Sequence, residues 1–222
     1  MPQIAPSILS ADFSRIAEAV KIVEEASADL LHIDIMDGHF VPNLTFGPQL
    51  VASLKEKTSL PLDVHLMVDN PQYFIPLFQD AGADWISIHL EASRHLNRDI
   101  SSIKQAGCKA GLALNPASSI HLMNDIIKDL DFVLLMTVNP GSGAQEFIEA
   151  SKTKISQLKN WIKGQNLNTL IEIDGGVKEI NIKDLSELGV DIFVVGSEVF
   201  KAKDPKATVI RLKNKLSKQE NE

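Results

Sequence analysis

Short apolar runs alternate along the chain with longer segments in which apolar residues recur every three or four positions. The runs predict strands at 3–7, 30–36, 62–67, 84–90, 109–114, 131–137, 169–174 and 191–196. The periodic segments predict helices at 13–26, 47–57, 72–81, 95–106, 118–129, 146–164, 178–188 and 205–217. Apolar strands that alternate with helices are typical of a parallel sheet buried under helices. Eight such units predict an α/β fold, the (β/α)₈ TIM barrel, with a doubly wound open sheet as the alternative.

A short repeat at the helix–strand junctions favours the closed barrel. The segments 27–31, 82–86 and 189–193 each end a predicted helix and begin a predicted strand around an aspartate, and Asp131 falls where a fourth copy would lie. The four copies mark every second strand. About 250 residues is typical of one such barrel, so the 222 residues predict a single domain over 1–222. Only the tail, 215–222, is expected to be solvated.

Polar side chains stand at every second position in two of the predicted strands. His32 and Asp34 share one face of the second strand, and Asp63 and His65 share one face of the third. An unsatisfied polar group on the inward face of a buried strand costs roughly 2–7 kcal/mol. Barrel strands end at one face, so His32, Asp34, His65 and Asp174, which ends the seventh strand, predict a site for one divalent metal ion. Separate hydrogen bonds of these groups to the backbone are the alternative.

The predicted ligand set narrows the choice of metal. Two imidazoles and two carboxylates suit Zn²⁺, Fe²⁺, Mn²⁺ or Co²⁺ better than the oxygen-seeking Ca²⁺ and Mg²⁺. Met36, Met67 and Met136 occupy matching positions near strand ends. Methionine is an adaptable core filler, and around a metal site these three side chains suggest a polarizable lining that excludes water.

Glycines follow three consecutive predicted strands. They lie in the segments 139–145, 174–177 and 196–197, the first of which leads toward a predicted helix. Glycine lets backbone N–H groups approach an oxyanion closely, and barrels of this class often bind phosphate near strands seven and eight. These loops contain no lysine or arginine. We therefore expect a phosphate held largely by the backbone.

Composition and charge exclude several classes of function. A net charge of −7 with scattered acids and bases argues against nucleic-acid binding and against an anionic membrane surface. The single cysteine, Cys108, cannot form an internal disulfide. No stretch approaches the roughly 20 apolar residues of a membrane span, and the start at 1–7 lacks the pattern of a signal peptide. We predict a cytoplasmic protein.

The motifs resemble those of the ribulose-phosphate 3-epimerase family. The matching segments are 32–43, 63–68, 136–141 and 174–177, and the resemblance runs from 5–12 to 196–197. It implies a (β/α)₈ barrel of the ribulose-phosphate-binding type that interconverts D-ribulose 5-phosphate and D-xylulose 5-phosphate in the pentose phosphate pathway. A small phosphorylated ketose as substrate and assembly as a homo-oligomer are expected with it.

The resemblance also implies roles for individual residues. Asp34 and Asp174 would be the acid/base pair as well as metal ligands, beside the ligands His32 and His65. The implied substrate contacts are Ser7, His65, Gly141, Ser142, Gly143, Ala144, Asp174, Gly175, Gly176, Gly196 and Ser197. Asp37, Asp63 and Glu172 are candidates for orienting the ligands, with capping or solvation as the alternative role.

The chain departs from the family pattern at the loop after the sixth strand. Gly141-Ser142-Gly143-Ala144 replaces Gly-Phe-Gly-Gly. The backbone N–H groups survive both changes, so phosphate binding is expected to survive, whereas loss of the aromatic ring is expected to loosen the lid over the substrate.

Other readings of the sequence remain open. Epimerases of D-allulose 6-phosphate share much of the pattern, and a non-catalytic phosphate-binding barrel is a further alternative. Related barrels that catalyse decarboxylation or aldol cleavage usually place a lysine at a strand end. Here only Lys109 lies in a predicted strand, at its start. His39, His89, His95 and His121 are left out of the chemistry, with His89 interpreted as a satisfied core histidine.

Overall fold

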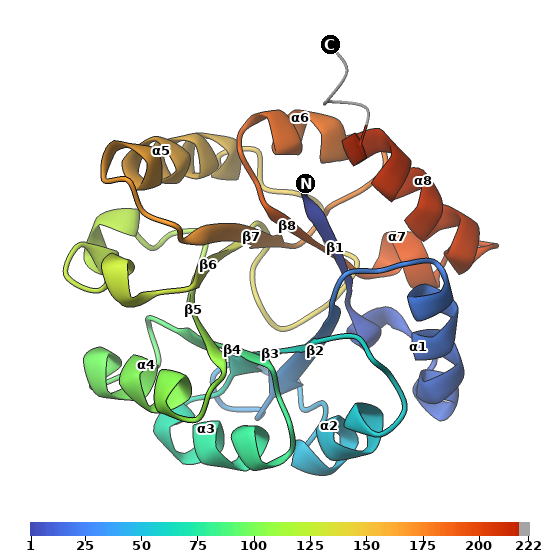
Figure 1. Ribbon diagram of the computed structural model, residues 1–222, viewed down its shortest axis with the longest axis horizontal. Coiled ribbons are helices and arrows are strands. Elements are labelled where there is room, and N and C mark those ends of the chain that lie inside the picture. The colour runs from blue at the N-terminus through green and yellow to red at the C-terminus, as the bar shows by residue number, and fades with distance from the viewer. Residues whose placement is uncertain (218–222) are drawn as a thin grey trace.

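The computed structural model describes residues 1–217, and these build a barrel of eight parallel strands ringed by helices (Figure 1). The strands are β1 Gln3–Pro6, β2 Leu31–Met36, β3 Leu62–Met67, β4 Trp85–His89, β5 Lys109–Leu114, β6 Phe132–Met136, β7 Leu170–Asp174 and β8 Ile192–Val195. Every strand lies within one residue of its predicted bounds. The closed barrel is therefore confirmed over the doubly wound sheet.

The helices cover the outside of the barrel. They are α1 Ile16–Glu25, α2 Pro48–Lys55, α3 Pro71–Asp80, α4 Leu96–Gln105, α5 Ser151–Gly164, α6 Ile182–Glu187, α7 Ser197–Phe200 and α8 Pro205–Ser217. The sequence did not predict α7. Of the tail expected to be solvated, Leu216 belongs to α8 and is buried, and 218–222 lie outside the described residues.

Three predicted helices were wrong in extent or type. The helix predicted at 178–188 spans only Ile182–Glu187. The segment 118–129 forms two 3₁₀ turns, Ile120–Met123 and Ile127–Asp129, in which backbone N–H groups bond to carbonyls three residues earlier, as Leu122 does to Ser119 and Leu130 to Ile127. The helix predicted at 146–164 begins only at Ser151. Residues before it bond elsewhere, since the N–H of Ile148 donates to the carbonyl of Thr137. The glycine loop after β6 thus does not run directly into a helix.

Side-chain alternation divides the apolar residues between two locations. Leu31, Ile33 and Ile35 of β2 pack in the large core between sheet and helices. The opposite face of the strands lines the lumen, which Trp85 and Phe132 help to fill. His32, Asp34 and Met36 therefore point into the barrel.

The repeated aspartates at the helix–strand junctions link neighbouring strands at the amino-terminal face of the barrel. Asp29, Asp84, Asp131 and Asp191 each accept a hydrogen bond from the first or second backbone N–H of the neighbouring preceding strand, at 2.8–2.9 Å. Each of these carboxylates also pairs with a lysine, namely Lys213, Lys55, Lys104 and Lys159 respectively. The sequence repeat is thus a device that ties adjacent strands together.

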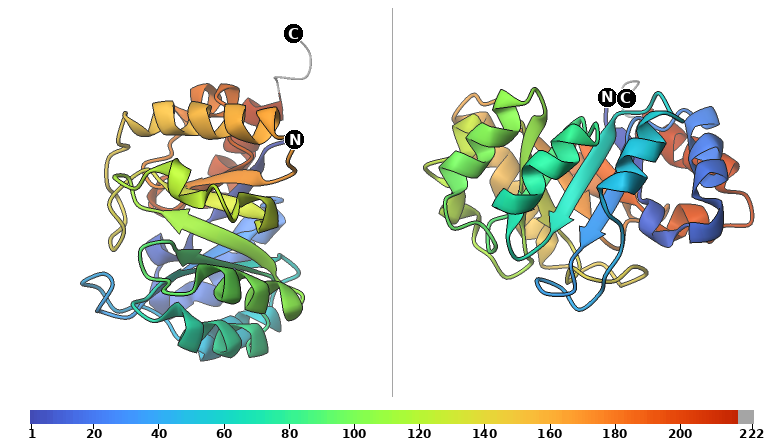
Figure 2. Two further views of the ribbon diagram at one scale, coloured as in Figure 1. Left: turned by 90° about the vertical axis from the view of Figure 1, so that its left-hand side faces the viewer. Right: turned by 90° about the horizontal axis from the view of Figure 1, so that it is seen from below.

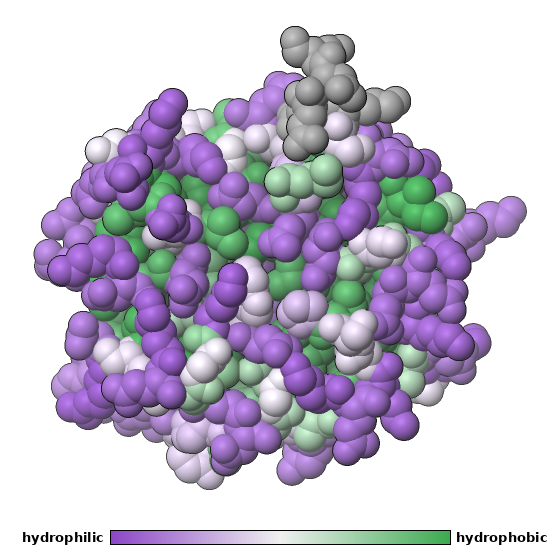
Figure 3. Space-filling view, in the orientation of Figure 1, coloured by the Kyte–Doolittle hydropathy of each residue, from purple (hydrophilic) through white to green (hydrophobic). Residues whose placement is uncertain are grey.

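The opposite face of the barrel carries the long loops. Figure 2 shows the loops after β2 and β6 extending beyond the carboxyl ends of the strands, away from the N-terminus. The barrel closes between β1 and β2 through one bridge, Ser7 to His32, so the seam lies at the predicted ligands. No helix within residues 1–217 is long and apolar enough to cross a membrane. The face seen in Figure 3 is mostly hydrophilic, with scattered apolar patches.

Candidate active site

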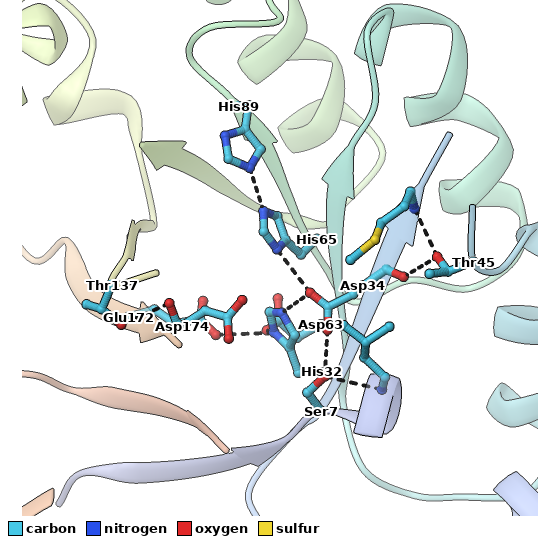
Figure 4. Close-up of polar contacts among 12 residues, drawn as sticks. Ser7, His32, Asp34, Thr45, Asp63, His65, His89, Thr137, Glu172 and Asp174 are labelled. Carbon is cyan, nitrogen blue, oxygen red and sulfur yellow. Dashed lines mark hydrogen bonds and ion pairs between the residues drawn. The ribbon is translucent and has the colours of Figure 1, made fainter. Parts of the chain in front are cut away.

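The inward faces of three strands bring the predicted metal ligands together. His32 and Asp34 come from β2, His65 from β3 and Asp174 from β7, and each offers a ligand atom within 4.8 Å of the others. Strand register places Asp34 opposite His65. Both histidines and Asp34 are buried, whereas Asp174 is partly exposed (Figure 4).

The donor atoms of this cluster fit a divalent cation. The Nδ1 atom of His32 lies 2.5 Å from Asp63, while its buried Nε2 has no hydrogen-bond partner and lies 3.4 Å from Asp34 Oδ1. The Nδ1 atom of His65 lies 3.3 Å from the same oxygen. Each imidazole thus directs one nitrogen at the cluster and uses the other elsewhere. Two such nitrogens and two carboxylates could hold a metal ion.

The two aspartates of the cluster have different acidities. Burial opposes ionisation of Asp34, but His32 and His65 outweigh it and hold the pKa of that carboxyl below its ordinary value. Asp34 also accepts a hydrogen bond of 2.5 Å from Ser7. Burial, reinforced by the charge of Asp34, raises the pKa of Asp174 to about 7. Near neutral pH one carboxyl is therefore ionised and the other is close to half-protonated.

Two buried acids lie next to the Nδ1 side of the His32 ring. Its Nδ1 atom lies 2.5 Å from Asp63 and 3.5 Å from Glu172. Burial and the neighbouring Asp63 raise the pKa of Glu172 well above its ordinary value. Burial alone would lower the pKa of His32, but Asp63 and Asp34 raise it well above its usual range. The three groups could themselves hold a cation, but His32 Nδ1 is already hydrogen-bonded to Asp63, which is placed to orient the ring. Neither carboxyl oxygen of Glu172 has a hydrogen-bond partner among the described residues.

Asp37, the third candidate for this orienting role, acts elsewhere. Its carboxylate accepts from the backbone N–H groups of His39, Phe40 and Asp69. These bonds shape the loop after β2, which is the capping role that the sequence left open.

An open cavity lies above the cluster. Of the predicted substrate-binding residues, the cavity lining includes Ser7, Gly141, Ser142, Gly143, Ala144, Asp174, Gly175, Gly176, Gly196 and Ser197, but not His65. Asp34 and the three methionines, Met36, Met67 and Met136, also line it. The lining contains no lysine or arginine from the described chain. Any anion held here would rely on backbone N–H groups and hydroxyls.

Two of the glycines are required by close contacts. A Cβ atom on Gly176, whose φ is +65°, would lie 2.4 Å from the backbone nitrogen of Phe147. A Cβ atom on Gly196 would lie 2.7 Å from the hydroxyl oxygen of Ser10. Ser10 itself lines the cavity, so the loop after β8 and the segment after β1 meet there.

Sequence reasoning missed several residues that shape the cavity. Asn43 donates to the carbonyl of Gly141, and Gln145 donates to the carbonyls of Asn139 and Ser142, so both hold the loop after β6 in place. Thr137 donates to the carbonyls of Asp174 and Gly175. Single polar residues in loops carry no periodicity, so only their place beside the recognised motifs could have pointed to them.

His89 is the most consequential omission. It is a satisfied core histidine, as expected, but one of its partners is His65, whose Nε2 atom lies 2.9 Å from His89 Nε2. Burial lowers the pKa of His65 to about 4 despite the opposing hydrogen bond with Asp34. His39, His95 and His121 are exposed and lie outside the cluster.

Fold and site together define a (β/α)₈-barrel enzyme with a carboxylate pair and a potential metal site in one cavity. Residues 3–200 match the model of the "Ribulose-phosphate 3 epimerase family". Curated ribulose-phosphate 3-epimerases are similar over most of their length: 45% identity in Aquifex aeolicus, covering 96% of both chains, and 46% in Bacillus subtilis, covering 96% of this chain and 99% of the relative. The chain belongs to the ribulose-phosphate 3-epimerase family and is an isomerase, which confirms the resemblance.

Solved structures with low sequence identity share the fold. A 3-hexulose-6-phosphate synthase from Salmonella typhimurium superposes with a TM-score of 0.72 at 16% identity, covering 97% of this chain and 99% of that one. KGPDC from Streptococcus mutans gives a TM-score of 0.74 at 13% identity, covering 98% of both chains. At these identities the likeness concerns the barrel alone.

Proposed function

We propose that this protein interconverts D-ribulose 5-phosphate and D-xylulose 5-phosphate by inverting carbon 3. The observation that carries the proposal is the pair Asp34 and Asp174, which line one cavity and differ in pKa. Inversion beside a ketone needs one group to remove a proton and another to return one to the opposite face. A pair of carboxyls with separated pKa values matches those two roles.

Each carboxyl has a defined part in this scheme. Asp34 is ionised beside two imidazoles and a serine hydroxyl. It acts as the base in the reaction direction in which it faces the proton on carbon 3. Asp174 returns a proton from the other side, and its pKa of about 7 in the metal-free protein shows that this carboxyl holds a proton readily. In the reverse direction the roles exchange, because Asp174 is also substantially ionised at neutral pH.

We propose that His32, Asp34, His65 and Asp174 hold one divalent ion, Zn²⁺, Fe²⁺, Mn²⁺ or Co²⁺. When bound, the cation would stabilise the negative charge that develops on the substrate oxygens as the proton leaves. The unpartnered Nε2 of His32 and the cluster-facing Nδ1 of His65 support this assignment. The choice among the four metals stays a prediction.

The phosphate of the substrate is proposed to bind at the glycine-containing loops after β6, β7 and β8. The backbone at Gly176 and Gly196 lines the cavity, and Ser10 and Ser197 line it as well. The substitutions at Ser142 and Ala144 keep their N–H groups. Cytoplasmic location and a homo-oligomeric state also stay predictions.

Turnover of ribulose 5-phosphate beside allulose 6-phosphate tests the choice of substrate. We expect the pentose phosphate to be used with the higher kcat/KM. A higher kcat/KM for allulose 6-phosphate would indicate an allulose-phosphate epimerase. Turnover of neither sugar would indicate a non-catalytic phosphate-binding barrel. Lys109 starts β5 at the amino-terminal face, so no aldol or decarboxylation activity is expected.

A solvent-isotope experiment tests the two-carboxyl mechanism separately. Product formed in D₂O should carry deuterium at carbon 3, because a carboxyl exposed to water between turnovers exchanges its proton within a turnover of about 0.1 s. Product free of deuterium would show that the original hydrogen is retained, and it would exclude proton exchange through Asp34 and Asp174.

A further inference from the structure

A line of hydrogen-bonded side chains extends from the metal cluster past the carboxyl end of β4 to Glu91, an exposed residue. His89, at the end of β4, is fully buried. Its Nε2 atom lies 2.9 Å from Nε2 of His65, and the two rings stack with centroids 5.0 Å apart (Figure 4). Its other nitrogen, Nδ1, lies 3.2 Å from a carboxylate oxygen of Glu91. The order is therefore Glu91, His89, His65, cluster.

Glu91, at the far end of this line, is held in place as a hydrogen-bond acceptor. One oxygen of Glu91 accepts from the backbone N–H of Asn115 at 2.9 Å and from the hydroxyl of Ser118, and the other faces His89. Burial opposes ionisation, but these hydrogen bonds outweigh it and lower the pKa of Glu91 to about 2. An ionised carboxylate has no proton to donate. The hydrogen bond between His89 and Glu91 can therefore run only from the ring to the acid.

The loop that supplies these donors is itself held in place. The ammonium group of Lys154, on α5, donates to the carbonyls of Asn115, Pro116 and Ser118 at 2.6–3.2 Å. Glu91 thus sits in a rigid frame built from the loop after β5 and the first turn of α5.

When a metal ion, and not the ionised Asp34, is the partner of Nδ1 of His65, the direction of this last bond sets every proton along the line. A neutral imidazole carries one N–H. If Nδ1 of His89 donates to Glu91, its Nε2 must accept, and Nε2 of His65 must be the donor across the 2.9 Å contact. The proton of His65 is then on Nε2, so Nδ1, the nitrogen 3.3 Å from Asp34, keeps its lone pair for the cluster.

We propose that Glu91 and His89 are positioning residues that fix the tautomer of His65, so that Nδ1 of His65 binds the metal ion. The inference rests on the proposed metal-dependent function. The acid acts through a second imidazole, whereas at His32 the orienting Asp63 touches the ring directly. Partners of metal-bound histidines that orient the ring in this way commonly change metal affinity 10–100-fold when mutated.

The tautomers can be read directly in the Zn²⁺-loaded protein, in which the metal ion and not Asp34 is the expected partner of Nδ1 of His65. In long-range ¹H–¹⁵N spectra of ¹⁵N-labelled wild type near pH 7, we expect His65 to be protonated on Nε2 and His89 on Nδ1. His65 protonated on Nδ1 would overturn the proposal, whatever happens to any variant.

Glu91→Gln is expected to reverse the direction of these hydrogen bonds while keeping nearly the same side-chain shape. The amide oxygen must keep accepting from the N–H of Asn115, so the amide NH₂ faces Nδ1 of His89. His89 would then accept at Nδ1 and donate from Nε2, and the proton of His65 would move to Nδ1. We expect the altered tautomers in the spectra and a 10–100-fold weaker affinity for Zn²⁺ or Co²⁺ in chelator competition.

Glu56→Gln is the matched control, because Glu56 is an exposed residue at the end of α2. It should leave both tautomers and metal affinity unchanged. A merely structural role for Glu91 predicts reduced thermal stability with unchanged tautomers and unchanged affinity in Glu91→Gln, and that result would also overturn the proposal. Absence of epimerase turnover in the wild type would instead overturn the proposed function alone, since the tautomers and the metal affinity are read without substrate.

Discussion

At the scale of single residues, the site is built from identical groups in different surroundings. Asp34 accepts from Ser7 and lies beside two imidazoles, whereas the side chain of Asp174 accepts no hydrogen bond from the residues that the structure describes and is affected by burial and by the charge of Asp34. The two carboxyls therefore have different protonation states at the same pH. In the metal-free protein one carboxyl is therefore a proton acceptor while the other can still hold a proton.

Replacing either carboxyl by its amide removes a proton carrier and keeps the shape. Asp34→Asn and Asp174→Asn should each lower kcat for epimerisation by roughly 10²–10⁴-fold, the usual contribution of a general acid or base. Metal content should be measured on the same samples, with the exposed Asp80→Asn as a control. Near wild-type turnover in a metal-loaded variant would contradict the two-carboxyl assignment.

Asp174 also makes stability depend on pH in the metal-free protein. Its folded pKa of about 7 exceeds the unfolded value of about 3.9, so the folded state binds more protons between these values. The free energy of unfolding therefore falls as pH rises from about 4 to about 7. Asp174→Asn should be more stable than wild type at pH 8, by at most about 4 kcal/mol, and the gain should vanish by about pH 4.

Denaturant unfolding in the presence of a chelator measures this difference. Asp80→Asn again controls for the loss of a negative charge, because Asp80 lies at the exposed end of α3. A variant at Asp174 that is less stable than wild type at pH 8 would show that the carboxylate is favoured by the fold.

At the scale of elements, the cavity depends on loops that meet from distant parts of the chain. The segment after β1 provides Ser10, and the loop after β8 provides Gly196, whose missing Cβ leaves room for the Ser10 hydroxyl. Asn43, in the loop after β2, holds the loop after β6. Substrate affinity should therefore respond to steric changes between these loops.

A double substitution separates two reasons why position 196 needs glycine: contact with Ser10 and contact with the phosphate. Gly196→Ala should raise KM for the phosphorylated sugar by roughly tenfold, about 1.4 kcal/mol, which is typical of overpacking, because the new methyl pushes the Ser10 hydroxyl. In Ser10→Ala/Gly196→Ala the nearest Ser10 atom would be Cβ, at 3.5 Å, so KM should return toward that of Ser10→Ala. A KM that stays raised would show that the methyl crowds the phosphate itself.

At the scale of the whole molecule, the two ends of the barrel have separate tasks. The carboxyl end holds the cavity, and the amino end is braced by the four junction aspartates, of which Asp84 binds the N–H of Leu62 and pairs with Lys55. Stability and activity should therefore be separable by mutation.

Asp84→Ala tests this separation. It leaves the N–H of Leu62 without its acceptor, which costs about 1–3 kcal/mol of unfolding free energy. Asp80→Ala, on the exposed end of α3, should cost far less. Both variants should keep wild-type kcat below their melting temperatures, and a large loss of kcat in folded Asp84→Ala would show that the amino end communicates with the cavity.

Most of the barrel could be predicted from the sequence, because strands and helices follow local periodicity. The bounds predicted for β3 and β5 match the structure, and strand alternation alone put His32 and Asp34 on one face. The family resemblance extended this to the glycine loops. The start of α5 could not be predicted, since it depends on Ile148 bonding to Thr137 rather than on the pattern of its own residues.

The sequence by itself determined the order of elements, the inward faces of the strands and the residue types available to bind a metal and a phosphate. The tertiary structure alone decided that Ser10 packs against Gly196, that His89 links Glu91 to His65, and that Asp34 and Asp174 differ in pKa. The physical reason is the distance along the chain over which each kind of interaction acts. Alternation and helical period act between neighbours in the chain, whereas hydrogen bonds, close packing and burial act between side chains that only the closed barrel brings together.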